Sequence, residues 1–114
     1  MDLSVVIGTY NRADLLGRSL AALQAQRTAP GLSWELVVVD NNSSDHTRSV
    51  IDTAGATFPA PLRYVFEPRQ GVGLARNTGV LRAQGEIIAF TDDDCRPEAT
   101  WVQNVSDCHA TLAC

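Results

Sequence analysis

The segment that most constrains this chain is the unbroken apolar run over residues 36–39, which follows Trp34 and Glu35 and ends at Asp40. A strand with apolar side chains on consecutive residues must be covered on both faces, which is typical of a parallel strand in an α/β protein. Three further short apolar runs predict strands at residues 3–7, 62–66 and 86–91. The chain is therefore predicted to fold as an α/β protein with an open, mainly parallel sheet flanked by helices.

Helices are expected between and after the strands, because leucines recur at helical spacing and turn residues separate the segments. The expected helices span residues 11–26, 44–54 and 73–83, and a last one begins near Pro97. Asn11 is the predicted N-cap of the first helix. Right-handed crossovers between parallel strands would bring the carboxyl ends of all strands to one edge of the sheet.

The composition narrows the class of protein. The 114 residues suit a single domain, and 45% hydrophobic with 19% charged residues is an ordinary globular balance. The net charge of -4 argues against a nucleic-acid partner, which would need a basic surface. The sequence contains no apolar run near the roughly 20 residues of a membrane span and no signal-peptide core, so a cytoplasmic location is expected.

The three cysteines form no CxxC pair, and their odd number disfavours a disulfide framework. A zinc set can be drawn from Cys95, Cys108, His109 and Cys114. Its irregular spacing and its adjacent Cys-His pair argue against one bound ion.

Polar segments follow all four predicted strands, at residues 8–12, 40–43, 67–71 and 91–94. In parallel sheets, ligands bind beyond the carboxyl ends of the strands, at the point where the strand order reverses. These segments are therefore expected to line a common ligand site.

Asp92, Asp93 and Asp94 follow the last predicted strand directly and are the sharpest chemical feature. Adjacent carboxylates repel one another unless a positive group lies among them. Alternate residues near a strand end can point the same way, so Asp92 and Asp94 are predicted to hold Mn²⁺ or Mg²⁺ together with substrate phosphates. The alternative is that one of these acids caps the helix expected at Pro97.

Three further positions have a chemical and a structural interpretation. Asp40 can accept the imide N–H of a uracil or thymine ring, or can simply form a turn. Tyr10 can stack on a nucleobase with Thr9 bonding to it, or can close the sheet edge. Arg76 can face a diphosphate or the acidic cluster, or can be an ordinary surface arginine. The glycines before Arg76 do not form a dinucleotide fingerprint, because the third glycine is missing and the segment follows the third strand.

Together these residues resemble the family 2 glycosyltransferases of the GT-A fold. The matching segments are SVVIGTYNR at residues 4–12, VVVDNNS at 37–43, GVGLARN at 71–77 and GEIIAFTDDD at 85–94. Each segment alone is only weakly specific for the family, but the four occur in the family's order and spacing over nearly the whole chain. The resemblance implies a Rossmann-like nucleotide-binding half with the strand order 3-2-1-4.

The resemblance also implies roles for single residues in binding a nucleoside-diphosphate sugar. The positions that match the family's nucleotide-binding residues are Thr9, Tyr10, Asn11, Arg12, Asp40, Arg76, Asp92 and Asp93. The first four match the segment along the nucleoside, and Asp40 matches the aspartate that binds the base. Asp92 and Asp94 match the metal-binding carboxylates of a DXD-type motif.

Residues 1–114 are thus expected to form the donor-binding half of a metal-assisted, inverting glycosyltransferase. A UDP-sugar is the favoured donor, and the acceptor is a hydroxyl of a sugar, lipid or polysaccharide. Family members usually run more than twice this length and carry the acceptor site and general base in their second half. Asp107 is the only acidic residue after Glu98, so the base is expected beyond Cys114.

Two alternatives belong to other classes of protein. One is a nucleotide-sugar-binding module without catalysis. The other is a nucleotidyltransferase, which would also pair carboxylates with Mg²⁺ but usually carries a glycine-rich loop after its first strand, where this chain has residues 8–11.

Overall fold

A four-stranded parallel sheet in the order β3-β2-β1-β4 organises the computed structural model, which describes residues 1–112, with side chains as far as residue 108. The strands are β1 (Leu3–Thr9), β2 (Trp34–Asp40), β3 (Leu62–Phe66) and β4 (Ile87–Phe90). The helices are α1 (Ala13–Gln24), α2 (Thr47–Gly55), α3 (Val72–Arg82) and α4 (Trp101–Leu112). The α/β class and the strand order match the sequence-based prediction. Cys114, one member of the disfavoured zinc set, lies outside the described residues.

The position of each strand in the sheet explains its burial. All seven residues of the central strand β2 are buried, and so are six of the seven in β1. The edge strands β3 and β4 each bury only one residue fully. An unbroken apolar run suits only a strand with neighbours on both sides and helices on both faces, and β2 has both.

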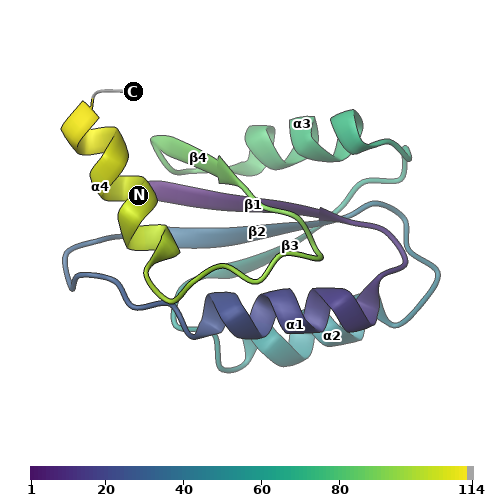
Figure 1. Cartoon of the computed structure of the whole chain (residues 1–114). Helices are drawn as coiled ribbons and strands as arrows, with labels where there is room; N and C mark the ends of the chain where they lie inside the picture. The colour runs from purple at the N-terminus through teal and green to yellow at the C-terminus, as the bar shows by residue number, and fades with distance from the viewer. Residues whose placement is uncertain (113–114) are drawn as a thin grey trace.

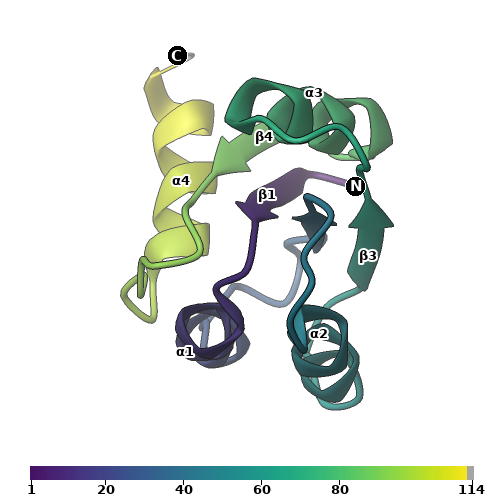
Figure 2. The same ribbon diagram turned by 90° about the vertical axis from the view of Figure 1, so that its right-hand side faces the viewer.

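The helices form two layers around the sheet (Figure 1). Helices α1 and α2 cover one face, where Leu16, Leu20 and Ile51 pack against alternate residues of the central strands. Helix α3 covers the other face, and its Ala75 packs against Val6 and Val39. Gly79 allows this close approach, because a Cβ there would overlap the side chain of Val6. Helix α4 lies beside β4 (Figures 1 and 2), and its Val102 is fully buried.

A buried ionic network joins α3 to the amino end of the sheet. Glu35 accepts hydrogen bonds from Ser4 Oγ at 2.6 Å, from Arg63 Nε at 2.9 Å and from the Gln84 backbone N–H at 2.7 Å. Burial alone would raise the pKa of Glu35, but these donors hold the pKa below its usual value. A buried carboxylate needs such complete pairing, so the network fixes the loop that leads into β4.

Several predicted boundaries are corrected by the structure. Arg12, not Asn11, is the N-cap of α1, and neither α1 nor α2 is capped by its own N-cap side chain. The last helix begins at Trp101 rather than near Pro97: residues 95–98 are irregular, and a turn closed by the Trp101 N–H bond to Glu98 O at 3.0 Å precedes the helix. β1 extends to Thr9, two residues beyond the predicted end.

Candidate functional site

A cleft of about 340 Å³ opens at the carboxyl edge of the sheet, where β1 and β4 lie side by side. Figure 2 views this edge, with α3 on one side of the sheet and α1 and α2 on the other. Strand order reverses between β1 and β4, so the cleft lies where open α/β sheets bind ligands. Seven predicted site residues line it: Thr9, Tyr10, Arg12, Arg76, Asp92, Asp93 and Asp94.

A tight turn sets the orientation of the three aspartates. The Cys95 backbone N–H donates to Asp92 O at 3.2 Å, which closes a four-residue turn directly after β4. The side chains of Asp92 and Asp94 point outward, with exposed fractions of 64% and 52%. Asp93 points inward and is only 6% exposed. The predicted pairing of Asp92 with Asp94 follows from this alternation.

Asp93 connects the turn to the end of β1 and to α1 through hydrogen bonds. Its carboxylate accepts a hydrogen bond from Thr9 Oγ1 at 3.0 Å and lies 3.4 Å from Arg12 Nη1. Its backbone carbonyl accepts from Ser19 Oγ of α1 at 2.8 Å. Both carboxylate oxygens are thus occupied within the chain, so the contacts of Asp93 are those of an anchor for the acidic turn.

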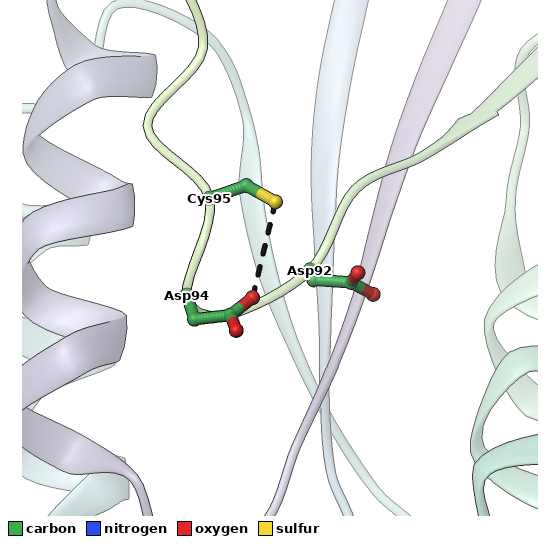
Figure 3. A group of neighbouring side chains, drawn as sticks. All are labelled: Asp92, Asp94 and Cys95. Carbon is green, nitrogen blue, oxygen red and sulfur yellow. Dashed lines mark hydrogen bonds between the residues drawn. The ribbon is translucent and has the colours of Figure 1, made fainter.

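Asp92 and Asp94 fit a hard divalent cation. One ligand atom from each of Asp92, Asp94 and Cys95 lies within 4.8 Å of the other two. Figure 3 shows the thiol of Cys95 bonded to the carboxylate of Asp94, at 3.8 Å, with Asp92 beside them. A thiolate is a soft ligand, and Mg²⁺ and Mn²⁺ prefer oxygen donors, which leaves the two carboxylates as the suitable ligands. Mg²⁺ and Mn²⁺ sites commonly have one or two carboxylates, completed by phosphates and water.

Two arginines flank the acidic turn. Arg12 Nη1 lies 3.9 Å from Asp94 Oδ2, and Arg76 Nη2 lies 3.7 Å from Asp92 Oδ1. The Arg76 guanidinium also lies 5.6 Å from the centre of the Phe90 ring. Because both arginines are about half exposed, their N–H groups remain accessible to a phosphate in the cleft.

Tyr10 and Asn11 follow β1 but differ in orientation. Tyr10 is 47% exposed and lines the cleft, so its ring offers a stacking surface. Asn11 adopts a positive φ of 50°, and its Oδ1 accepts from the Ser44 backbone N–H at 2.7 Å. The Asn11 side chain therefore joins two loops and does not line the cleft.

Asp40 is buried at the end of β2 and also does not line the cleft. Its Oδ1 accepts from the Ser43 backbone N–H at 2.9 Å, and its Oδ2 accepts from the Tyr64 hydroxyl at 2.7 Å. Burial and the bond to Asp40 raise the pKa of Tyr64 to about 12. A carboxylate offers about four acceptor sites, so two remain after these bonds. Contact of Asp40 with a base stays a prediction.

Asn41 and Glu67 lie in the polar segments expected at the ligand edge, but neither was assigned a role of its own from the sequence. Asn41 lines the cleft although it is only 5% exposed, and its side chain bonds to the loop between β3 and α3. Glu67 is 4% exposed and accepts from Arg69 and Thr78, which lowers its pKa to about 2. The available signal was a polar residue directly after a buried strand at both positions.

His46 lies exposed, 3.6 Å from Asp14.

An acidic turn at the switch point of a parallel sheet, flanked by arginines and an exposed tyrosine, lies where open α/β domains bind their ligands. The sequence model for "Glycosyl transferase family 2" matches residues 4–107. The chain belongs to this family.

Named relatives and solved structures agree with this assignment. Over 100 residues the chain is 35% identical to glycosyltransferase AglE of Haloferax volcanii, in a match that covers 88% of this chain and 33% of AglE. The structure of S. aureus TarS 1-349 in complex with UDP superposes with a TM-score of 0.86 at 26% identity, over 97% of this chain and 32% of that one. Mannosyltransferase PcManGT from Pyrobaculum calidifontis, in complex with GDP-Man and Mn2+, gives 0.77 at 32% identity, over 91% and 31%. The chain thus spans about a third of the length of each.

Among residues 1–112, no helix is both long enough and apolar enough to cross a membrane.

Proposed function

We propose that this chain binds a nucleoside-diphosphate sugar with Mn²⁺ or Mg²⁺ and forms the donor-binding half of an inverting glycosyltransferase. A UDP-sugar is the donor we favour, and a sugar, lipid or polysaccharide hydroxyl is the acceptor. We place the reaction in the cytoplasm. The solved structures of relatives with UDP and with GDP-Man and Mn2+ support a nucleotide-sugar donor of this kind.

The observation that carries the proposal is the placement of Asp92 and Asp94 opposite Arg76 at the switch point. A diphosphate alone would be repelled by the two exposed carboxylates. A divalent cation held by Asp92 and Asp94 would offset this repulsion and would supply a positive charge that stabilises a departing diphosphate. Arg12 and Arg76 lie where they can donate to the remaining phosphate oxygens.

The nucleoside would lie along the end of β1. Tyr10 presents its ring for stacking, and Thr9 lies beside it in the cleft wall. Asn11 would act indirectly in this arrangement, because its side chain holds the loop after β1 against Ser44. Asp93 would likewise support the site by anchoring the acidic turn to Thr9 and Arg12.

Asp40 would read the base through a free acceptor site of its carboxylate. An ionised carboxylate accepts the imide N–H of uracil but does not match the unprotonated N3 of cytosine. This role predicts that the chain prefers UDP over CDP, and that Asp40→Asn reduces the preference.

Titration calorimetry with UDP tests the proposal, with MnCl2 in one series and EDTA in the other. We expect binding in Mn²⁺ and little binding in EDTA. Equal affinity in both series would refute the role of Asp92 and Asp94. A donor-consumption assay, with transferred and hydrolysed sugar resolved, then separates a transferase from the alternative of a non-catalytic binding module.

A further inference from the structure

We infer that Asn41 is a positioning residue for the nucleotide site: its side-chain amide holds the start of α3, and with it Arg76, at the correct distance from the acidic turn. The inference rests on the proposed function for its ligand. Asn41 carries no charge, and it directly follows Asp40, whose side chain does not line the cleft.

Three hydrogen bonds from one amide support this role. Asn41 Nδ2 donates to Glu67 O at 3.0 Å and to Arg69 O at 2.8 Å, while Oδ1 accepts from the Gly71 backbone N–H at 2.9 Å. Two carbonyls facing the nitrogen and one N–H facing the oxygen define which way the amide points. Every polar group of the side chain is thus matched to the loop between β3 and α3.

Asn41 also connects opposite sides of the cleft. Its backbone N–H donates to Thr9 O at 2.8 Å, at the end of β1. Gly71, which its side chain holds, is the N-cap of α3, and the Gly71 carbonyl accepts the Ala75 N–H at 3.0 Å. Helix α3 then presents Arg76 to the cleft, 3.7 Å from Asp92. One residue therefore links β1 to the first turn of the helix that carries Arg76.

Replacement by aspartate removes the donors without changing the shape. In Asn41→Asp the new carboxylate can still accept the Gly71 N–H, but it faces the carbonyls of Glu67 and Arg69 with no proton to donate. Two lost bonds and the repulsion between oxygens should release the loop. Asn42 provides a matched control, because it is the next residue, is exposed, and its side-chain amide lies 3.4 Å from Pro68 O, at the long end of hydrogen-bond distances.

The first measurement is UDP affinity in MnCl2 at pH 7.5 for wild type, Asn41→Asp and Asn42→Asp. We expect a loss of about tenfold or more for Asn41→Asp, on the scale of two hydrogen bonds, and wild-type affinity for Asn42→Asp. Both variants add one negative charge at adjacent positions, so a general electrostatic effect would weaken both. Equal losses in the two variants would overturn the inference.

The second measurement is the pH profile of the same affinities, which separates positioning from a general loss of structure. Once protonated, the carboxyl group introduced by Asn41→Asp can donate again to one carbonyl, and the surrounding acceptors should raise its pKa. The defect of Asn41→Asp relative to wild type should therefore shrink as the pH falls from 7.5 to 5.5. The ionisable neighbours are Asp40, Glu67 and Arg69. These three groups are also present in Asn42→Asp, whose UDP affinity relative to wild type should not change over this pH range. A defect of Asn41→Asp that stays constant with pH would contradict the inference.

Hydrogen exchange on the free proteins gives a readout without nucleotide. The amides of residues 69–75 should exchange faster in Asn41→Asp than in Asn42→Asp, whereas those of β1 and β2 should not change. If wild type binds no UDP, the proposed function fails while the exchange result still tests Asn41. If wild type binds UDP and the exchange pattern of Asn41→Asp is that of wild type, the positioning role fails.

Discussion

Arg76 of α3 and Asp92 of the turn after β4 face each other across the cleft, with 3.7 Å between Nη2 and Oδ1. The two side chains come from separate βα units and are both more than half exposed, so the pair is held by the fold and not by mutual burial. An exposed pair of this kind contributes little to stability. Both side chains line the cleft, so under the proposed function they would exchange partners when a cation and a phosphate bind.

Asp92→Asn and Asp94→Asn should each reduce the UDP affinity measured in MnCl2 by about tenfold or more, as expected when a metal site is disturbed. Neither change should weaken the residual binding in EDTA, because each removes a carboxylate that repels the diphosphate when no metal is bound. Asp52→Asn is the matched control, because Asp52 is an exposed helical carboxylate paired with Arg48. Calorimetry decides the question, and a loss that is equal with and without metal would contradict the metal role.

Asp40→Asn should weaken UDP binding by about 1–3 kcal/mol, the usual scale for a charge-assisted hydrogen bond. The loss should persist in EDTA, because Asp40 would act at the base and not at the phosphates. Tyr64→Phe is the control, since it removes one donor to Asp40 and leaves the carboxylate in place. A loss seen only with metal present would show that Asp40 does not read the base.

Glu67 should make the stability of the domain depend on pH in the acid range. Its folded-state pKa is lowered to about 2, chiefly by hydrogen bonds from Arg69 and Thr78. A lowered pKa stabilises the fold above the unfolded-state value of about 4.3 and loses this effect as the pH falls toward 2. The melting temperature of wild type should thus exceed that of Glu67→Gln at pH 7, and the gap should narrow between about pH 4 and pH 2. A gap that does not change over this range would contradict the assignment.

Gly85→Ala should lower the free energy of unfolding by about 1–3 kcal/mol, the usual scale of overpacking. A Cβ at Gly85 would lie 2.5 Å from the backbone of both Leu3 and Ser4, which cannot move aside cheaply. Gly31→Ala is the control, because a Cβ there meets nothing within 4 Å. Urea unfolding of the two variants measures the difference, and equal stability would show that the start of β1 can shift.

The sequence alone determined the elements whose signal is local. The unbroken apolar run before Asp40 required a strand covered on both faces, and β2 is buried along its whole length. The alternation of strands and helices implied a parallel sheet, and the polar segments after the strands predicted where the cleft lies. The closeness of the Asp92 and Asp94 side chains also agrees with the expectation that alternate residues near a strand end point the same way, and their role as metal ligands stays a prediction.

Only the tertiary structure decided which polar side chains face the cleft and which hold it together. Asp93 turns inward because Thr9, 84 residues away in the chain, donates to it. Asn11 does not cap α1, because its side-chain oxygen accepts a hydrogen bond from the Ser44 backbone N–H instead. Asn41 finds its three partners in a loop about 26 to 30 residues further on. Hydrogen bonds between distant segments produce no periodic pattern in the sequence. They form only where the folded sheet brings the two strand ends together, so they could not be predicted from the sequence.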